Sequence, residues 1–221
     1  MILAIETSSL VCGASLHSGG ECISENYLEQ ARVHAEKLAG IVRDLLEEQK
    51  IRIQKLDAVA VSAGPGSFTG LRIGMSFAKG LVYPHRIPLA AVNSMKAFIA
   101  GNREEVLPGK KPVWVIHSHR DNIYAAELSE PVDSVKIRYG KTEDLAIWYP
   151  ECKQIVSNAD IDVPGVTLIK KPILPSVIGN YYVQYMPGEA VTDYESLALE
   201  YGMNYKPKEW GSASGKNANK Q

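Results

Sequence analysis

A glycine-rich segment at residues 63–74, Ala-Gly-Pro-Gly-Ser-Phe-Thr-Gly-Leu-Arg-Ile-Gly, constrains the fold more than any other part of this 221-residue sequence. It follows an apolar run at 56–62 and opens a second, helix-like run at 69–82, an order that predicts strand, turn and helix. Such a turn aims backbone N–H groups at an anion or at another backbone. The candidate loop residues are Gly64, Pro65, Gly66, Ser67, Phe68 and Thr69.

Two common phosphate-binding patterns do not fit this loop. A P-loop places Lys after its second glycine, whereas Leu71 follows Gly70 here. A dinucleotide fingerprint places its third glycine three residues after the second, whereas Gly70 comes four residues after Gly66. Pro65 also removes one N–H donor from the turn. The sequence therefore indicates another role for the loop, with Ser67 or Thr69 as the cap of the following helix.

The helix predicted at 69–82 consists mainly of small and apolar residues. Gly70, Gly74 and Ala78 recur every four residues, which places them on one face as a smooth stripe. Two glycines inside a helix cost roughly 1 kcal/mol each relative to alanine, so we expect close packing to offset that cost. The packing surface is either the chain's own core or a second protein, and the residues alone leave both open.

The other apolar runs predict two similar halves, an α/β fold with one mixed sheet in each half. The first half, residues 1–102, has the order β-β-β-α-β-α-β-α: strands at 1–5, 11–17, 21–28, 57–62 and 88–92, and helices at 33–49, 69–82 and 94–100. The second half, residues 103–203, is a reduced copy: strands at 113–118, 123–128, 135–139, 154–156 and 166–169, and helices at 142–148 and 176–186. Residues 204–221 lack enough apolar side chains to fold and are expected to be disordered.

Composition places the chain among cytoplasmic globular proteins. With 24 Lys and Arg against 25 Asp and Glu, its net charge of −1 gives no overall attraction to nucleic acid. The three cysteines, Cys12, Cys22 and Cys152, follow no metal-binding spacing and indicate free thiols in a reducing compartment. The sequence begins with no secretory signal pattern and contains no long apolar run, so we expect neither secretion nor a membrane span.

Three segments carry a resemblance to a known family: Ile-Leu-Ala-Ile-Glu-Thr-Ser-Ser at 2–9, the region around His34, and the glycine-rich segment. They are similar to the TsaB family, also called YeaZ, of the actin-like ATPase (ASKHA) superfamily, formerly labelled glycoprotease-like. The similarity runs through about Ser94 and extends more loosely over 113–128, where Arg120 and Tyr124 match. The resemblance implies a two-lobed actin-like, ribonuclease H-like fold.

TsaB is the non-catalytic partner of TsaD in the synthesis of threonylcarbamoyladenosine on tRNA, so the resemblance implies a scaffold rather than an enzyme. It implies direct binding to TsaD, contact with TsaE through the complex, indirect contact with tRNA, and a homodimer when the chain is alone. We expect the helices at 33–49 and 69–82 to form a four-helix bundle with two helices of TsaD. The interface residues expected are His34, Leu38, Ile41, Leu45, Gly70, Leu71, Gly74, Met75, Ala78 and Leu81.

Glu6, Thr7 and Ser8 lie where this fold places its first phosphate loop. Kinases of the fold use an acidic residue there to hold Mg²⁺ through water, so the three residues are either a vestigial nucleotide site or a simple turn after the first strand. The turn is favoured because no glycine follows Glu6 to let a phosphate approach. We expect no cofactor in this chain, although an adenine nucleotide at a subunit junction stays an alternative.

Two enzymatic alternatives remain open. One is an actin-like ATPase or small-molecule kinase that uses Glu6 and the loop at 64–70. The other is a glycoprotease-type metallopeptidase, which needs paired metal ligands, whereas Leu38 stands four residues after His34. His117 and His119 share one face of a predicted strand, but a polar strand face explains them better than a metal site. No catalytic residue and no metal ligand are predicted.

Overall fold

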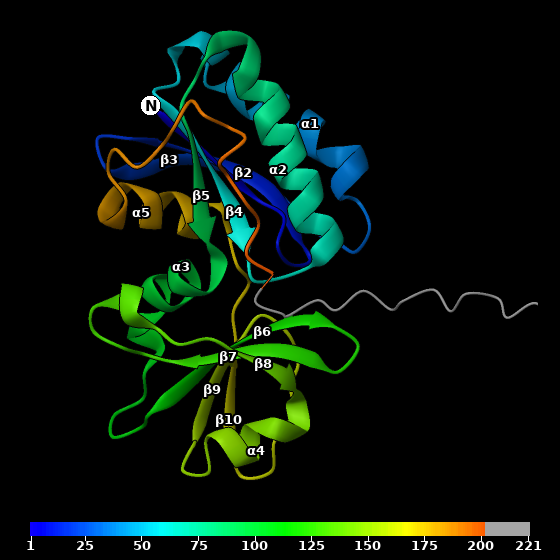
Figure 1. Cartoon of the computed structure of the whole chain (residues 1–221), viewed down its shortest axis with the longest axis vertical. Helices are drawn as coiled ribbons and strands as arrows, with labels where there is room; N and C mark the ends of the chain where they lie inside the picture. Colours follow the sequence, from blue (N-terminus) through cyan, green and yellow to red (C-terminus); the bar gives the residue numbers. More distant parts are fainter. Residues whose placement is uncertain (202–221) are drawn as a thin grey trace, which may run out of the picture.

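The computed structural model of the protein describes residues 1–201, in which a five-stranded mixed sheet forms the centre of the first lobe (Figure 1). The strand order is β3-β2-β1-β4-β5, antiparallel from β3 to β1 and parallel from β1 to β5. The strands are β1 (Ile2–Glu6), β2 (Val11–Ser18), β3 (Glu21–Glu29), β4 (Ala58–Gly64) and β5 (Leu89–Asn93). The helices are α1 (His34–Glu48), α2 (Phe68–Val82) and α3 (Ser94–Gly101).

The second lobe repeats this topology with the order β8-β7-β6-β9-β10 and the same change from antiparallel to parallel pairing. Its strands are β6 (Pro112–His119), β7 (Asn122–Glu127), β8 (Arg138–Lys141), β9 (Gln154–Ser157) and β10 (Thr167–Lys170). Its helix is α4 (Leu145–Trp148), and α5 (Pro175–Tyr185) follows β10 in the chain. A loop joins β9 to β10 where the first lobe has α2, so the prediction of two similar lobes with a reduced second one is confirmed.

Short 3₁₀ turns complete the described elements: η1 (Ile53–Lys55), η2 (Tyr83–His85), η3 (Arg103–Glu105), η4 (Val132–Ser134) and η5 (Thr142–Asp144). They account for the largest differences from the sequence-based boundaries. The strand predicted at 135–139 begins only at Arg138, after η4, and the helix predicted at 142–148 divides into η5 and α4. The disorder predicted for 204–221 concerns residues outside the described range.

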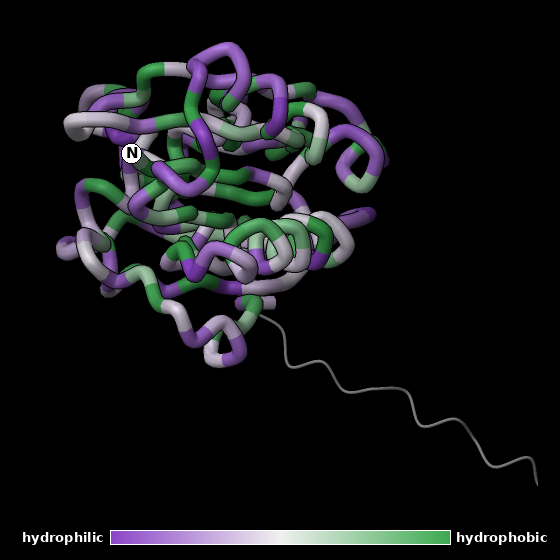
Figure 2. Tube along the Cα trace, turned by 90° about the horizontal axis from the view of Figure 1, so that it is seen from above, coloured by the Kyte–Doolittle hydropathy of each residue, from purple (hydrophilic) through white to green (hydrophobic). Residues whose placement is uncertain are grey.

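Helices cover both faces of the first sheet (Figure 1). One hydrophobic core lies between this sheet and the helices α1 and α2. A second core is shared by the two lobes: Ala4 and Ala60 of the first sheet, Phe98 of α3, Trp114 of the second sheet and Tyr181 of α5 belong to one cluster. In Figure 2 the hydrophobic stretches of the chain concentrate in the interior, whereas the loops around them are largely hydrophilic. The two lobes are therefore joined by packing as well as by the chain.

The C-terminal part of the described chain returns to the first lobe, which differs from the prediction of a second domain over 103–203. Helix α5 packs on β1 and β2, and the backbone N–H of Ser176 at its start donates to the Glu25 carboxylate at 2.6 Å. A single β-bridge then joins Val191 to Leu89 of β5. The first lobe thus consists of residues 1–102 together with about 172–201. None of the helices between residues 1 and 201 has the length and hydrophobicity that a bilayer span requires.

Candidate protein-interaction site

Helices α1 and α2 lie side by side on one face of the first sheet, and both begin next to the β1–β2 loop (Figure 1). Helix α1 forms because its apolar residues recur at helical spacing and face the core: the buried side chains are His34, Leu38, Ile41, Val42, Leu45 and Leu46. Helix α2 begins at Phe68, and the Ser67 hydroxyl accepts a hydrogen bond from the Gly70 N–H at 3.3 Å. Of the two predicted caps, Ser67 is the one that the structure uses.

The side chains predicted to meet TsaD face the interior of this chain. Those of α1 are buried: His34 and Ile41 are 7% exposed, Leu38 is 2% and Leu45 is 0%. On α2, Leu71 and Ala78 are fully buried, Met75 is 5% exposed, and Gly70 and Gly74 are buried as well; Leu81 alone is partly exposed. The prediction that these residues form an external face is therefore corrected, because they pack on the first sheet and on the β1–β2 loop.

The glycine-rich segment packs tightly on that loop. A Cβ added at Gly66 would overlap the Ser8 carbonyl oxygen, and one added at Gly70 or Gly74 would overlap Thr7. The Ser67 N–H donates to the Ser8 carbonyl at 2.7 Å, which joins the two loops directly. The stripe of small residues thus lets two backbones of the same chain meet. The close packing that the two helical glycines require is provided within the lobe.

Glu6, Thr7 and Ser8 are fully buried beneath this contact. Glu6 Oε1 accepts hydrogen bonds from the Ser8 N–H at 2.5 Å and from the Ser8 hydroxyl at 2.6 Å, and the Thr7 N–H donates to Ser62 Oγ at 3.2 Å. Burial raises the pKa of Glu6 to about 8, against the opposing effect of these hydrogen bonds. A buried, neutral carboxyl group does not present a carboxylate to hydrated Mg²⁺, so the geometry supports the turn over the vestigial nucleotide site.

The buried carboxyl group predicts a pH dependence of stability. The pKa of Glu6 is near 4.5 in the unfolded chain and about 8 in the folded chain, so only the folded state holds the proton between these values. The free energy of unfolding therefore falls as pH rises from about 4.5 to about 8, by about 1.4 kcal/mol for each pH step of one. We expect Glu6→Gln to exceed the natural chain by roughly 3–5 kcal/mol at pH 8 and to match it at pH 4.5. Urea unfolding across this range measures the difference, and parallel curves for the two proteins would contradict it.

Two of the histidines considered as metal ligands, His34 and His117, make hydrogen bonds to the backbone. His34 Nε2 lies 3.1 Å from the Ser9 carbonyl oxygen and 3.2 Å from that of Val11, which ties the start of α1 to the β1–β2 loop. His117 Nε2 lies 2.6 Å from the Arg120 carbonyl oxygen within the β6–β7 hairpin. Throughout residues 1–201, no three His, Cys, Asp or Glu side chains come together as a metal site. The His119 ring lies 3.1 Å from Ser118 Oγ and 3.3 Å from Asn122 Nδ2, so the side-chain hydrogen bonds of both hairpin histidines stay within the hairpin.

The surface that α1 and α2 turn away from the core combines charged side chains of α1, such as Glu36, Arg43 and Glu47, with small and apolar residues, and we call the small and apolar set the outer face. Ala35 and Ala39 of α1 are exposed, and Ile73 and Phe77 of α2 are only half-buried. Gly80 on α2 is exposed, and so is part of Gly40 on α1; an added Cβ would meet nothing within 4 Å at either glycine. The outer face comprises Ala35, Ala39, Gly40, Ile73, Phe77 and Gly80. Sequence reasoning missed it, although helical glycines outside the Gly70–Gly74 stripe were a signal.

A cleft of about 860 Å³ opens between the lobes beside the first turns of α1 and α2. Arg32, His34 and Ser67 line it from the first lobe, and His117 and Asp160 line it from the second. Ala35 and Ile73 contribute to the same cleft and also belong to the outer face. A molecule bound in the cleft would therefore lie at the edge of any protein docked on the outer face.

Both lobes share one topology: the first three strands of each sheet pair antiparallel, and the last two add in parallel. This repeated topology defines an actin-like two-lobed protein. The fold is similar to the structure titled "YeaZ from Pseudomonas aeruginosa", with a TM-score of 0.69 and 23% identity over 90% of this chain and 98% of that one. Residues 21–176 match the profile of the family described as "TsaD: tRNA N6-adenosine threonylcarbamoyltransferase". The chain belongs to this family, in its TsaB (YeaZ) branch.

Curated relatives carry names from the same pathway. The tRNA threonylcarbamoyladenosine biosynthesis protein TsaB of Haemophilus influenzae is 28% identical over 127 residues, which cover 58% of this chain and 53% of the relative. TsaB of Bacillus subtilis is 35% identical over 102 residues, 46% of this chain and 44% of the relative. A tRNA N6-adenosine threonylcarbamoyltransferase of Fusobacterium nucleatum is 30% identical over 190 residues, 77% of this chain and 54% of the relative. The chain spans about half the length of the curated relatives that it matches.

Proposed function

We propose that this chain is a non-catalytic scaffold subunit in the biosynthesis of N6-threonylcarbamoyladenosine on tRNA, and that it supports TsaD by binding it through the outer face. The observation that carries the proposal is the pair of glycines with open space opposite them. Gly40 and Gly80 lie inside helices, where each costs roughly 1 kcal/mol relative to alanine, and no group within residues 1–201 uses the room that they leave. A second pair of helices approaching closely would use it.

The remaining outer-face residues support the same occupant. Ala35 and Ala39 have small side chains, which would let a facing helix approach α1 closely. Ile73 and Phe77 leave apolar surface exposed to water, and a partner would cover it. Two helices on each side give a four-helix bundle, the arrangement expected from the sequence. When no TsaD is present, the same face pairs with a second copy of this chain, because a two-fold arrangement makes it complementary to itself.

Within such a complex the covalent chemistry belongs to TsaD. TsaE joins through the assembly, and tRNA is contacted indirectly, in line with the net charge of −1. If an adenine nucleotide takes part, the cleft beside the outer face supports a site at the subunit junction. The buried Glu6 and the closely packed glycine loop argue against an ATPase or kinase site of the chain's own.

Removing the exposed glycine should separate stability from association. We expect Gly80→Ala to stabilise the free chain by about 0.5–1 kcal/mol, because alanine is the better helix former and has room for its Cβ. The same methyl group should weaken binding to TsaD about tenfold, since it holds the facing helix away. Thermal unfolding and titration with TsaD measure the two effects. Ser76→Ala, an exposed position on the same helix, is the control and should leave binding unchanged.

Reconstitution tests the proposed function as a whole. Purified TsaD is assayed for threonylcarbamoyl transfer to tRNA, with the other pathway components present and with or without this chain. We expect modification to depend on the chain, and the chain alone to show neither transfer nor ATP turnover. ATP hydrolysis by the chain alone that is lost in Glu6→Ala would favour the kinase or ATPase alternative. Modification that proceeds equally without the chain would refute the scaffold role.

A further inference from the structure

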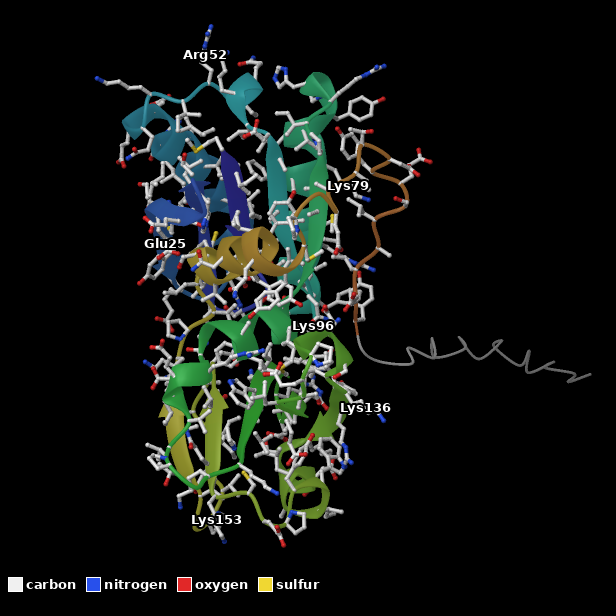
Figure 3. All side chains as sticks on the ribbon, turned by 90° about the vertical axis from the view of Figure 1, so that its left-hand side faces the viewer. Glu25, Arg52, Lys79, Lys96, Lys136 and Lys153 are labelled. Carbon is white, nitrogen blue, oxygen red and sulfur yellow. The ribbon has the colours of Figure 1, made fainter. Side chains whose placement is uncertain are left out.

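Residues 191–201, called here the latch segment, run along α2 without forming a helix or strand (Figure 1, orange). The segment starts at the β-bridge between Val191 and Leu89. The Tyr194 hydroxyl donates to the Ile87 carbonyl at 2.9 Å, and Lys79 Nζ donates to the Leu197 carbonyl at 3.1 Å. Figure 3 shows Lys79 next to this segment, on the side of α2 that faces it. The first part of the segment, residues 191–197, is thus hydrogen-bonded to β5, to the residue Ile87 before it, and to the last turn of α2.

The other end of the latch segment meets the glycine loop and both lobes. The Glu200 N–H donates to the Ala63 carbonyl at 2.7 Å, and a Cβ added at Gly64 would overlap the Glu200 carbonyl oxygen. The Asn93 side-chain amide donates to the Glu200 carboxylate. The segment therefore sits on the carboxyl ends of β4 and β5, and the first glycine of the loop is the one that makes room for it.

Tyr201 contacts two elements, α2 and β7, which belong to different lobes. Its ring lies 4.8 Å from that of Phe68 between centroids, and its hydroxyl accepts a hydrogen bond from Arg72 Nε at 3.1 Å. Its carbonyl accepts a hydrogen bond of 2.6 Å from the hydroxyl of Tyr124, which belongs to β7 of the second lobe. The guanidinium of Arg72 also lies 3.9 Å from the centroid of the Phe68 ring. One residue thus connects the first turn of α2 to the other lobe.

These contacts divide the surface of α2 into three parts. One side packs on the core, and the outer face is open. The third side contacts the latch segment through Phe68, Arg72 and Lys79, which share one side of the helix, and Tyr83 of η2 continues this contact. Helix α2, which carries half of the outer face, is therefore held both by the core and by the latch segment.

We infer that residues 191–201 form a releasable latch that fixes α2 and the glycine loop, and that its release weakens docking at the outer face. This inference rests on the proposed function, because it concerns the same face. The segment is held by scattered hydrogen bonds and a few apolar side chains rather than by a ladder, so it opens more readily than the sheet beneath it. A partner binding a helix that is already fixed loses less conformational freedom than one binding a mobile helix.

The test uses the full-length chain with two substitutions at the tip, Glu200→Pro and Tyr201→Ala. Proline removes the N–H that bonds Ala63, and alanine removes the ring and hydroxyl that contact Phe68 and Arg72. We expect amide hydrogen exchange over residues 63–72 to accelerate at least tenfold while β1 and β2 stay protected. Affinity for TsaD should fall about tenfold. Glu195→Gln, an exposed change in the same segment, is the control and should alter neither quantity.

Unchanged hydrogen exchange at 63–72 in the double variant would overturn the latch. Faster exchange with full affinity for TsaD would overturn the coupling to docking. The proposed function is judged separately by Ile73→Glu on the outer face. If that variant also binds TsaD normally, the docking site is wrong, while the exchange experiment still decides whether the latch exists.

Discussion

Ile73→Glu is expected to lower the affinity for TsaD by at least about 100-fold, while the free chain stays folded and loses roughly 1–2 kcal/mol of stability with the packing of the isoleucine. Ile73 is half-buried on the outer face, so a glutamate there keeps its carboxylate in water while the chain is alone. In the complex the same carboxylate would lie between helices without a partner. Burying an unpaired charge costs several kcal/mol, and about 2.8 kcal/mol corresponds to 100-fold in affinity.

The matched control is Ile23→Glu. Ile23 is 46% exposed on β3, the edge strand of the first sheet. Both variants therefore replace isoleucine by glutamate, but only Ile73→Glu does so on the outer face. Titration with TsaD and thermal unfolding of both variants give the comparison. Equal loss of affinity in the two variants, or normal affinity of Ile73→Glu, would show that TsaD does not dock on the outer face.

Ala78→Glu is expected to destabilise the chain by at least about 4 kcal/mol, a large part of the roughly 5–15 kcal/mol by which native proteins are stable. Ala78 is fully buried between α2 and the first sheet, where a carboxylate has neither space nor a cation. Gly74→Leu should act similarly, because even a Cβ at this position overlaps Thr7. From the sequence, both positions looked suitable for testing a docking face. The structure predicts that such variants lose TsaD binding only because they no longer fold.

Urea denaturation followed by circular dichroism measures this loss. Ser76→Glu places the same charge two residues earlier, at an exposed position of α2, and should change the free energy of unfolding by less than about 0.5 kcal/mol. A stable, fully folded Ala78→Glu variant would mean that α2 presents its other side to the core. The docking site would then lie on the residues predicted from the sequence rather than on the outer face.

The sequence predicted elements better than orientations. Helix α1 was expected at 33–49 and spans His34–Glu48, and the glycine loop was placed between strand and helix as observed. The direction in which α2 faces could not be derived, because Leu71 and Met75 on one side and Ile73 and Phe77 on the other are all apolar. Periodicity shows which residues share a side, and tertiary packing decides which side is buried.

Long-range contacts account for the remaining differences. The Ser67 cap depends on neighbours three residues away and was among the caps predicted. The contact of Gly70 and Gly74 with Thr7 joins segments more than 60 residues apart, and nothing local indicates it. Likewise, α5 follows the second sheet in the chain but packs on the first, since the first sheet offers a face that α3 covers only in part. Arg72 and Tyr201, 129 positions apart, had no detectable relation before folding.

The return of α5 to the first lobe has a consequence for synthesis on the ribosome. Strands β1 and β2 are made first, yet the helix that covers their second face spans Pro175–Tyr185 and emerges more than 150 residues later. Until then the nascent chain exposes an apolar sheet surface to the cell, which is the kind of surface that chaperones bind. Completion of the first lobe therefore waits until α5 has been synthesised, and a chain that stops before Pro175 leaves one face of the first sheet uncovered.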